Sequence, residues 1–175
     1  MRKFLYALAA IAVATAGFAQ TSDPSAAQDG DFGARLLISD DPESFWAQWA
    51  KPGVPQMSTT SRIARERPVE TIIVFHDCVP AADGNCDVTV HFEITGPDGH
   101  AYDKPHNAVA WKHPPAPGHN LLASEASFGF RLEPKDKLGR YVINATLTDK
   151  VSGKSLSLRE MVTAVSSLSS PPPTT

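Results

Sequence analysis

Hydrophobic and polar residues alternate with a period of two along much of the second half of the chain. The clearest run extends from Cys86 to Ile94, and similar runs cover residues 122–132, 139–148 and 155–165. This period is that of a β-strand, in which successive side chains point to opposite faces. Segments rich in Gly, Pro and Asp separate the runs and are typical of turns. The pattern therefore predicts an all-β domain.

The phase of each run predicts which side chains face the core. These are Val88, Val90, Phe92 and Ile94, then Ala126, Phe128, Phe130 and Leu132, then Tyr141, Ile143, Ala145 and Leu147. In the last run the inward positions pass from Leu156 and Leu158 to Met161 and Val165, which is a change of phase. A change of phase within one strand predicts a β-bulge near Glu160.

The run over residues 69–76 does not alternate. Ile73 and Phe75 are apolar on one face of the expected strand, and Ile72 and Val74 are apolar on the other. A strand that is apolar on both faces needs a cover on each side, because apolar surface left in water on either face costs free energy. We therefore expect a second layer outside this strand.

A short helix is predicted over residues 42–51. Asp41 is a typical N-cap residue and Pro42 fits the first helical position. The helix carries three aromatic residues, Phe45, Trp46 and Trp49. We expect them to form the second cover on the strand at 69–76, near Ile72 and Val74. The alternative is an exposed aromatic patch that binds a partner protein.

Two further segments are interpreted as connections. The sequence Gly96-Pro97-Asp98-Gly99 predicts a turn, after which residues 100–103 are expected to pair back on the preceding strand. Residues 107–120 are rich in Pro and His and are predicted to form a loop.

The beginning of the chain is typical of a secretory signal peptide. Arg2 and Lys3 precede a short apolar run, and small residues around Ala19 match a cleavage site. The apolar run is too short to span a bilayer. We therefore expect residues 1–19 to be a signal peptide, and the mature protein to lie in a periplasm or to be secreted, without membrane insertion.

The rest of the chain is predicted to form one domain. Residues 20–34 are expected to be disordered, residues 35–165 to form the domain, and residues 166–175 to be a disordered Ser/Pro-rich tail. Of the 16 Lys and Arg residues two lie in the signal peptide, which leaves 14 against 19 Asp and Glu. This acidic balance argues against a partner that is a nucleic acid.

One motif indicates a more specific architecture. The run Asp136-Lys137-Leu138-Gly139-Arg140-Tyr141 resembles the D-x-x-G-x-Y run that opens the penultimate strand of immunoglobulin-like domains, and residues 142–158 resemble their last hairpin. The whole pattern also resembles small uncharacterised secreted proteins of Gram-negative bacteria. The resemblance covers residues 69–165. It implies an immunoglobulin-like antiparallel β-sandwich with one short N-terminal helix, a tyrosine corner at Tyr141, and no particular activity.

The two cysteines, Cys78 and Cys86, flank a local connection. In an exported protein such a pair predicts a disulfide, worth about 2–3 kcal/mol in the chain-entropy model. It cannot be the disulfide that joins the two sheets of an antibody domain. A redox site would need a closer pair at a helix start, and a zinc site would need more ligands.

All six histidines lie between His76 and His119, and three of them fall in the connection expected after the turn hairpin, namely His106, His113 and His119. Loop histidines can bind copper or zinc, although no H-x-H or H-x-x-x-H pair occurs here. None of the common hydrolase, zinc-protease or phosphate-loop motifs occurs either. We expect neither a catalytic site nor a cofactor.

Two functions are consistent with these patterns. The first is an exported non-catalytic immunoglobulin-like module that binds another envelope protein or supports an envelope assembly. The alternative is a small periplasmic metal-binding protein that uses the loop histidines. The first expectation rests on a fold without a catalytic motif, and the second on the clustering of the histidines.

Overall fold

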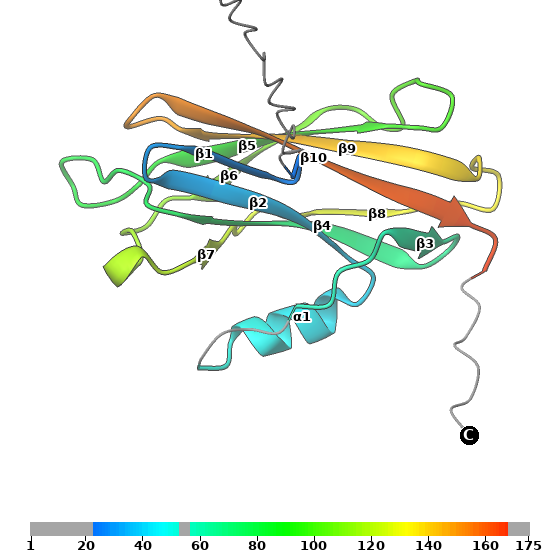
Figure 1. The fold of residues 1–175 in the computed structure, drawn as a ribbon, viewed down its shortest axis with the longest axis horizontal. Helices are drawn as coiled ribbons and strands as arrows, with labels where there is room; N and C mark the ends of the chain where they lie inside the picture. Colours follow the sequence, from blue (N-terminus) through cyan, green and yellow to red (C-terminus); the bar gives the residue numbers. More distant parts are fainter. Residues whose placement is uncertain (1–22, 53–56, 168–175) are drawn as a thin grey trace, which may run out of the picture.

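The computed structural model describes residues 23–52 and 57–167, apart from the side chain of His119, as two β-sheets stacked face to face (Figure 1). The predicted signal peptide lies outside the described residues, as do residues 20–22 and 168–175. No helix among the described residues is long and apolar enough to cross a membrane.

The first sheet has the order β1-β2-β4-β7, and β8 also pairs with β4. Its strands are β1 (Ala26–Asp29), β2 (Phe32–Ser39), β4 (Pro68–His76), β7 (Leu122–Ala123) and β8 (Phe128–Arg131). The second sheet has the order β3-β10-β9-β5-β6. Its strands are β3 (Arg62–Ala64), β10 (Lys154–Val165), β9 (Gly139–Asp149), β5 (Val88–Thr95) and β6 (His106–Trp111). Pairing is antiparallel except between β3 and β10.

This architecture confirms the predicted all-β sandwich. In the second sheet, β10, β9, β5 and β6 follow the order of the G, F, C and C′ strands in immunoglobulin-like domains. The core between the sheets contains the inward residues predicted for β5 and β9, all of them buried. The side chain of Tyr141 is only 1% exposed, and its hydroxyl donates to the carbonyl of Lys137 at 2.9 Å. The predicted tyrosine corner is therefore present.

Helix α1 (Pro42–Trp49) covers the outer face of the first sheet (Figure 1). The carboxylate of Asp41 accepts from the Ser44 amide at 3.1 Å, as expected of an N-cap residue. Phe45 is buried against Leu37, Ile72 and Val74, with Trp46, Trp49 and Met57 around them. This second cluster confirms that the helix is the outer cover of β4. Of the three aromatic residues, Phe45 is buried in this cluster, and Trp46 and Trp49 pack against it while partly exposed.

The disorder predicted for residues 20–34 is wrong from Asp23 onwards. Residues 26–35 form a hairpin, since Ala26 pairs with Arg35 and Asp29 with Phe32. Ala, Asp and Gly make up most of residues 23–35 and give little hydrophobic signal. Its order comes from pairing with β4 through β2, which the local sequence does not encode.

The loop predicted over residues 107–120 is wrong in its first part, because His106–Trp111 form β6 at the edge of the second sheet. Small residues, Ala108 and Ala110, occupy its inward positions, and they weakened the apolar signal.

The strand predicted over residues 122–132 is divided into β7 and β8, because the residues between them make local hydrogen bonds through Ser124. The expected return strand after the turn at 96–99 is reduced to one bridge, between Thr95 and Ala101.

The bulge predicted near Glu160 is absent. β10 pairs with β9 in one unbroken register from Lys154↔Asp149 to Ala164↔Gly139. Val162 and Ala164 are the buried positions, whereas Met161 is 40% exposed. The phase change in the sequence reflects a polar residue, Glu160, at an inward position rather than an extra residue in the strand.

Candidate functional site

Three connections meet at one end of the sandwich, which lies on the left in Figure 1. They are residues 77–87 between β4 and β5, residues 112–121 between β6 and β7, and residues 150–153 between β9 and β10. They meet because each begins at a strand that runs towards this end. We call these three connections the loop end.

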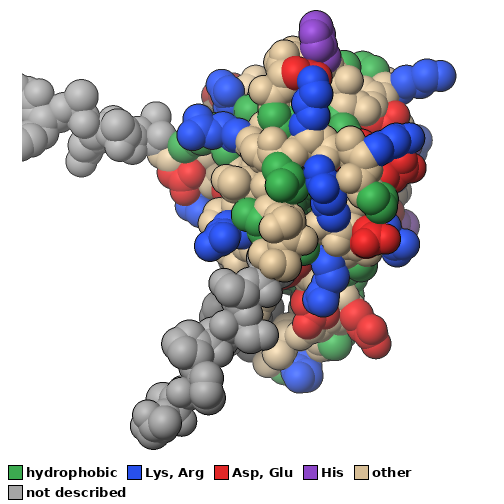
Figure 2. Space-filling view, turned by 90° about the vertical axis from the view of Figure 1, so that its right-hand side faces the viewer, with side chains coloured by type: hydrophobic (Ala, Val, Ile, Leu, Met, Phe, Trp, Pro, Cys, Tyr) green, Lys and Arg blue, Asp and Glu red, His purple; other side chains and the backbone are tan. Residues whose placement is uncertain are grey.

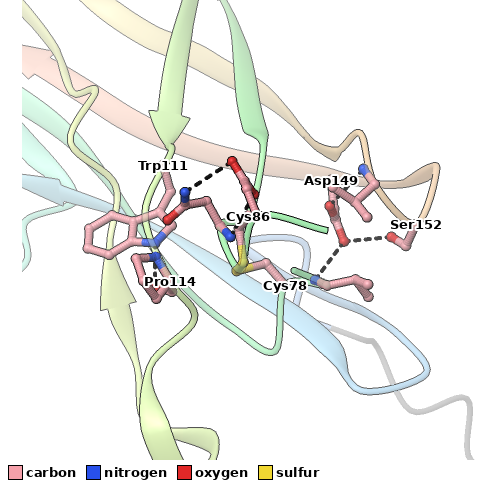
Figure 3. Close-up of a disulfide and its surroundings, with 10 residues drawn as sticks. Cys78, Cys86, Trp111, Pro114, Asp149 and Ser152 are labelled. Atoms are coloured by element: carbon pink, nitrogen blue, oxygen red, sulfur yellow. Dashed lines mark hydrogen bonds between the residues drawn. A yellow bond between two sulfur atoms is a disulfide. The ribbon is translucent and has the colours of Figure 1, made fainter. Parts of the chain in front are cut away.

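The disulfide predicted between Cys78 and Cys86 is present in the first of these loops (Figure 3). Their Cα atoms are 6.0 Å apart, and the two residues are 4% and 1% exposed. Inside the disulfide ring, the amides of Asn85 bond the carboxylate of Asp83, which lowers the pKa of that carboxyl group. The loop therefore has a fixed internal structure as well as a covalent closure.

Asp149 joins the first loop to the third. It is fully buried at the end of β9, and its carboxylate accepts from the Val79 amide at 3.0 Å and the Ser152 hydroxyl at 2.6 Å (Figure 3). Its other oxygen accepts from the Val151 amide at 3.1 Å. Bonds to an ionised acceptor are about twice as strong as neutral ones. One carboxylate thus fixes two loops relative to each other.

The second loop is joined to the first through the backbone. The Cys86 amide donates to the carbonyl of His113 at 2.9 Å. Trp111 contacts this loop, since its indole nitrogen donates to the carbonyl of Pro114 at 3.0 Å (Figure 3) and its ring contacts the rings of His113 and Phe75. Hydrogen bonds therefore join all three loops to one another.

Apolar side chains are exposed on this fixed framework. Val79 is 41% exposed, Val151 is 38% exposed and Leu121 is 49% exposed. Val79 and Val151 lie close to each other, because their amides bond the same carboxylate. Rigid loops that present apolar side chains have a low entropic cost of binding, since little remains to be ordered.

A groove of about 510 Å³ lies beside the loop end on the outer face of the first sheet. Its lining includes Gly33, Arg35, Met57, Val74, His76 and Leu121. The His76 ring lies directly on Gly33, where a Cβ atom would be only 2.4 Å from Nε2. Asp77 holds the same ring through Nδ1 at 2.8 Å. Only glycine at position 33 leaves room for this arrangement.

The structure places two of the predicted loop histidines, His106 and His113, apart from each other. His106 starts β6 and its ring contacts the ring of Phe128 in a tilted arrangement, whereas His113 lies beyond the end of β6 and contacts Glu125 at 3.0 Å. Seven residues of mostly extended chain separate the two histidines by roughly 20 Å. The side chain of His119 is outside the description. Among the described residues, no group of three His, Cys, Asp or Glu side chains is placed to hold a metal ion.

The histidines also make polar contacts on the strands and beside the loops. His91 on β5 bonds the amide oxygen of Asn107 at 2.8 Å and lies 3.4 Å from Glu93, and these two contacts raise its pKa. Within the part of the chain that the structure covers, His76, His91 and His113 bond carboxylate or amide oxygens. A hydroxyl or thiol next to a histidine is what nucleophilic catalysis needs.

Sequence reasoning found the disulfide but not the cross-link through Asp149 or the groove. Asp149-Lys150-Val151-Ser152 does contain a turn signal, because Asp and Ser side chains often bond backbone amides two residues on. Nothing local indicates that the same carboxylate also reaches Val79, 70 residues away.

No family model matches the chain, and no curated protein matches it. Among solved structures, the alkylpurine DNA glycosylase AlkC of Pseudomonas fluorescens is similar at 13% identity and TM-score 0.40, over 59% of this chain and 27% of that one. A superoxide reductase (neelaredoxin) from Ignicoccus hospitalis is similar at 8% identity and TM-score 0.37, over 67% and 90%. A lytic polysaccharide monooxygenase from Streptomyces lividans is similar at 16% identity and TM-score 0.31, over 62% and 61%.

The chain spans about a quarter of the glycosylase. At these identities and TM-scores, none of these proteins transfers an activity or a site to this chain.

Proposed function

We propose that this chain is an exported, non-catalytic module of immunoglobulin-like type that binds another envelope protein through its loop end. The observation that carries the proposal is the shared Asp149 carboxylate, which fixes two loops with Val79 and Val151 exposed beside each other. Such fixed apolar side chains suit a protein interface better than a solvated surface.

The compartment is supported by two independent features. The first 19 residues are typical of a secretory signal peptide, and the disulfide between Cys78 and Cys86 is of a kind that persists in oxidising compartments. A non-catalytic role fits the histidine contacts described above, which offer no activated nucleophile. The metal-binding alternative has no pair of loop histidines to start from within the described side chains.

Site-specific photo-crosslinking in the native cell tests the interface. A photoreactive phenylalanine analogue at Val79 or Leu121 should give a discrete adduct with one envelope protein. The matched control is Met161, which is equally exposed at 40% but lies on the outer face of β10. Adducts at Met161 of the same intensity, or none at the loop end, would contradict the proposal.

A further inference from the structure

The opposite end of the sandwich carries the excess of positive charge. It is formed by residues 62–67, 96–105 and 131–140, which we call the basic end. These segments hold eight Lys or Arg and five Asp or Glu, a formal charge of +3. The other described residues hold six Lys or Arg and fourteen Asp or Glu, a formal charge of −8. Figure 2 looks at this end and shows Lys and Arg side chains in a band down its face.

The framework of the basic end is rigid. The Tyr102 hydroxyl donates to the Asp136 carboxylate at 2.7 Å, and its ring packs against Tyr141 at 5.3 Å. The ammonium group of Lys137 lies 2.9 Å from the Asp98 carboxylate, which lowers the pKa of that carboxyl group. A guanidinium nitrogen of Arg65 donates to the backbone carbonyl of Asp136. These contacts join all three segments.

Four arginines of this end are exposed and have no ion-pair partner within 4 Å among the described residues: Arg62, Arg67, Arg131 and Arg140. They lie in two neighbouring sets. Arg131 is opposite Pro68, so that Arg67 is next to it in the first sheet. In the second sheet, Thr163 pairs with both Arg62 and Arg140 and separates them.

Like charges on one surface repel each other, and a bound anion offsets this repulsion. Three of the five carboxylates of this end are engaged with Lys135, Lys137 or Tyr102 of the same end, and this leaves the four arginines available to an external negative partner. Leu138 lies in the segment 131–140 of the same end, and its side chain is 43% exposed and can add an apolar contact. Arginine together with an apolar anchor is typical of protein interfaces.

We propose that the basic end is a second docking surface, which takes a carboxylate-rich segment of a partner protein. Arginine forms paired bonds to carboxylates, and two arginine sets on a fixed framework can hold two acidic side chains at a set spacing. The surface is separate from the loop end and does not depend on the function proposed for it. With both ends occupied, the module connects two proteins.

An anionic lipid surface is the less suitable occupant. Recognition of lipid headgroups uses clusters of four to eight basic residues with little acidic interruption. Here five carboxylates lie among the basic residues of the same end. A mixed pattern of charges selects a partner whose own charges are held at fixed positions, and the headgroups of a fluid lipid layer are not held in this way.

Titration of ¹⁵N-labelled protein with two short peptides tests the proposal. One peptide is Glu-rich and the other is Lys-rich, with the same length and the same apolar residues. The Glu-rich peptide should shift amide signals of residues 62–67 and 131–140, and this binding should weaken from 50 to 300 mM salt because exposed charges are screened. The Lys-rich peptide should leave these signals unchanged. Shifts elsewhere, or equal shifts with both peptides, would overturn the proposal.

Charge reversal gives the matched comparison. Arg67→Glu with Arg131→Glu should weaken binding of the Glu-rich peptide by at least about tenfold. Lys112→Glu with Arg159→Glu makes the same change of charge outside the basic end and should leave the affinity within about twofold. The midpoint of thermal unfolding should be similar in both double variants, since all four residues are exposed.

Two results would assign the surface to another occupant and overturn the proposal. The first is binding to phosphatidylglycerol vesicles, without peptide binding, that is lost in the Arg67→Glu/Arg131→Glu variant. The second is self-association of the wild-type chain, measured by sedimentation, that disappears in the same variant, because the acidic remainder of a second copy would then be the partner.

Discussion

The two ends of the sandwich are fixed by different means. At the loop end a disulfide and one buried carboxylate hold short loops, and hydrophobic side chains stay exposed on them. At the basic end two tyrosines, Tyr102 and Tyr141, hold the connections through their rings and hydroxyls. The first end is stapled by polar and covalent links, whereas the second is anchored in the hydrophobic core. Substitutions at the basic end should therefore destabilise the whole fold, whereas substitutions at the loop end should have local effects.

The largest effect is expected at the basic end, from Tyr141→Ala. This side chain is buried and belongs to the main core, so its removal leaves a cavity and should cost about 4 kcal/mol. Tyr141→Phe retains the ring and removes only the hydrogen bond to Lys137, which should cost about 1 kcal/mol. Urea denaturation of both variants measures the difference. Equal effects would mean that the corner acts only through its hydroxyl.

The next effect is expected at the loop end, from replacing Cys78 and Cys86 together with Ala. Loss of so short a disulfide ring should lower the free energy of unfolding by about 2–3 kcal/mol. The change should be local, and amide exchange should increase in residues 77–87 while the basic end keeps its protection. Faster exchange at Tyr141 as well would show that the two ends are not independent.

Asp149→Asn tests the link between two loops at the same end. The amide oxygen can replace only part of the acceptor capacity of the carboxylate, and the amide group would face hydrogen-bond donors. We expect a cost of about 2 kcal/mol, the scale of hydrogen bonds to a charged group. Exchange of the Val79 and Val151 amides should increase together, because both bond this carboxylate. Ser152→Ala removes one donor and serves as the milder control.

The smallest effect is expected from Tyr102→Phe at the basic end. The Tyr102 hydroxyl is the main cause of the lowered pKa of Asp136, so its removal should raise that pKa towards the ordinary value of an aspartate. A lowered folded-state pKa stabilises the fold above the unfolded-state value, and this contribution disappears as the pH falls below about 4.

At neutral pH, Tyr102→Phe should therefore cost about 0.5–1 kcal/mol, and in acid the wild type and the variant should converge. An NMR titration of the Asp136 carboxyl group measures the pKa directly. An unchanged pKa in the variant would mean that the backbone amide of Glu133, which also bonds this carboxylate, is sufficient to lower it.

The sequence determined those features whose cause is local. Alternation located β5 and β9, the cap and aromatic residues located α1, and the spacing of Cys78 and Cys86 indicated their disulfide. The D-x-x-G-x-Y run indicated the tyrosine corner, because its hydrogen bond joins residues only four positions apart. Each of these features depends on side chains that are neighbours along one element or one turn.

The tertiary structure decided the features whose cause lies in another segment. β1 and β6 are strands because neighbouring strands pair with them, although the side chains of β1 are small or polar and the inward residues of β6 are the alanines Ala108 and Ala110. β10 pairs with β9 in one continuous register, although its sequence shows an apparent change of phase. The contact between Asp149 and Val79 and the collection of basic residues at one end depend on which connections the topology brings together. The hydrophobic pattern along a chain specifies which face of a helix or strand is buried. Strand pairing and the distribution of charge in space depend instead on which segments the fold brings next to each other.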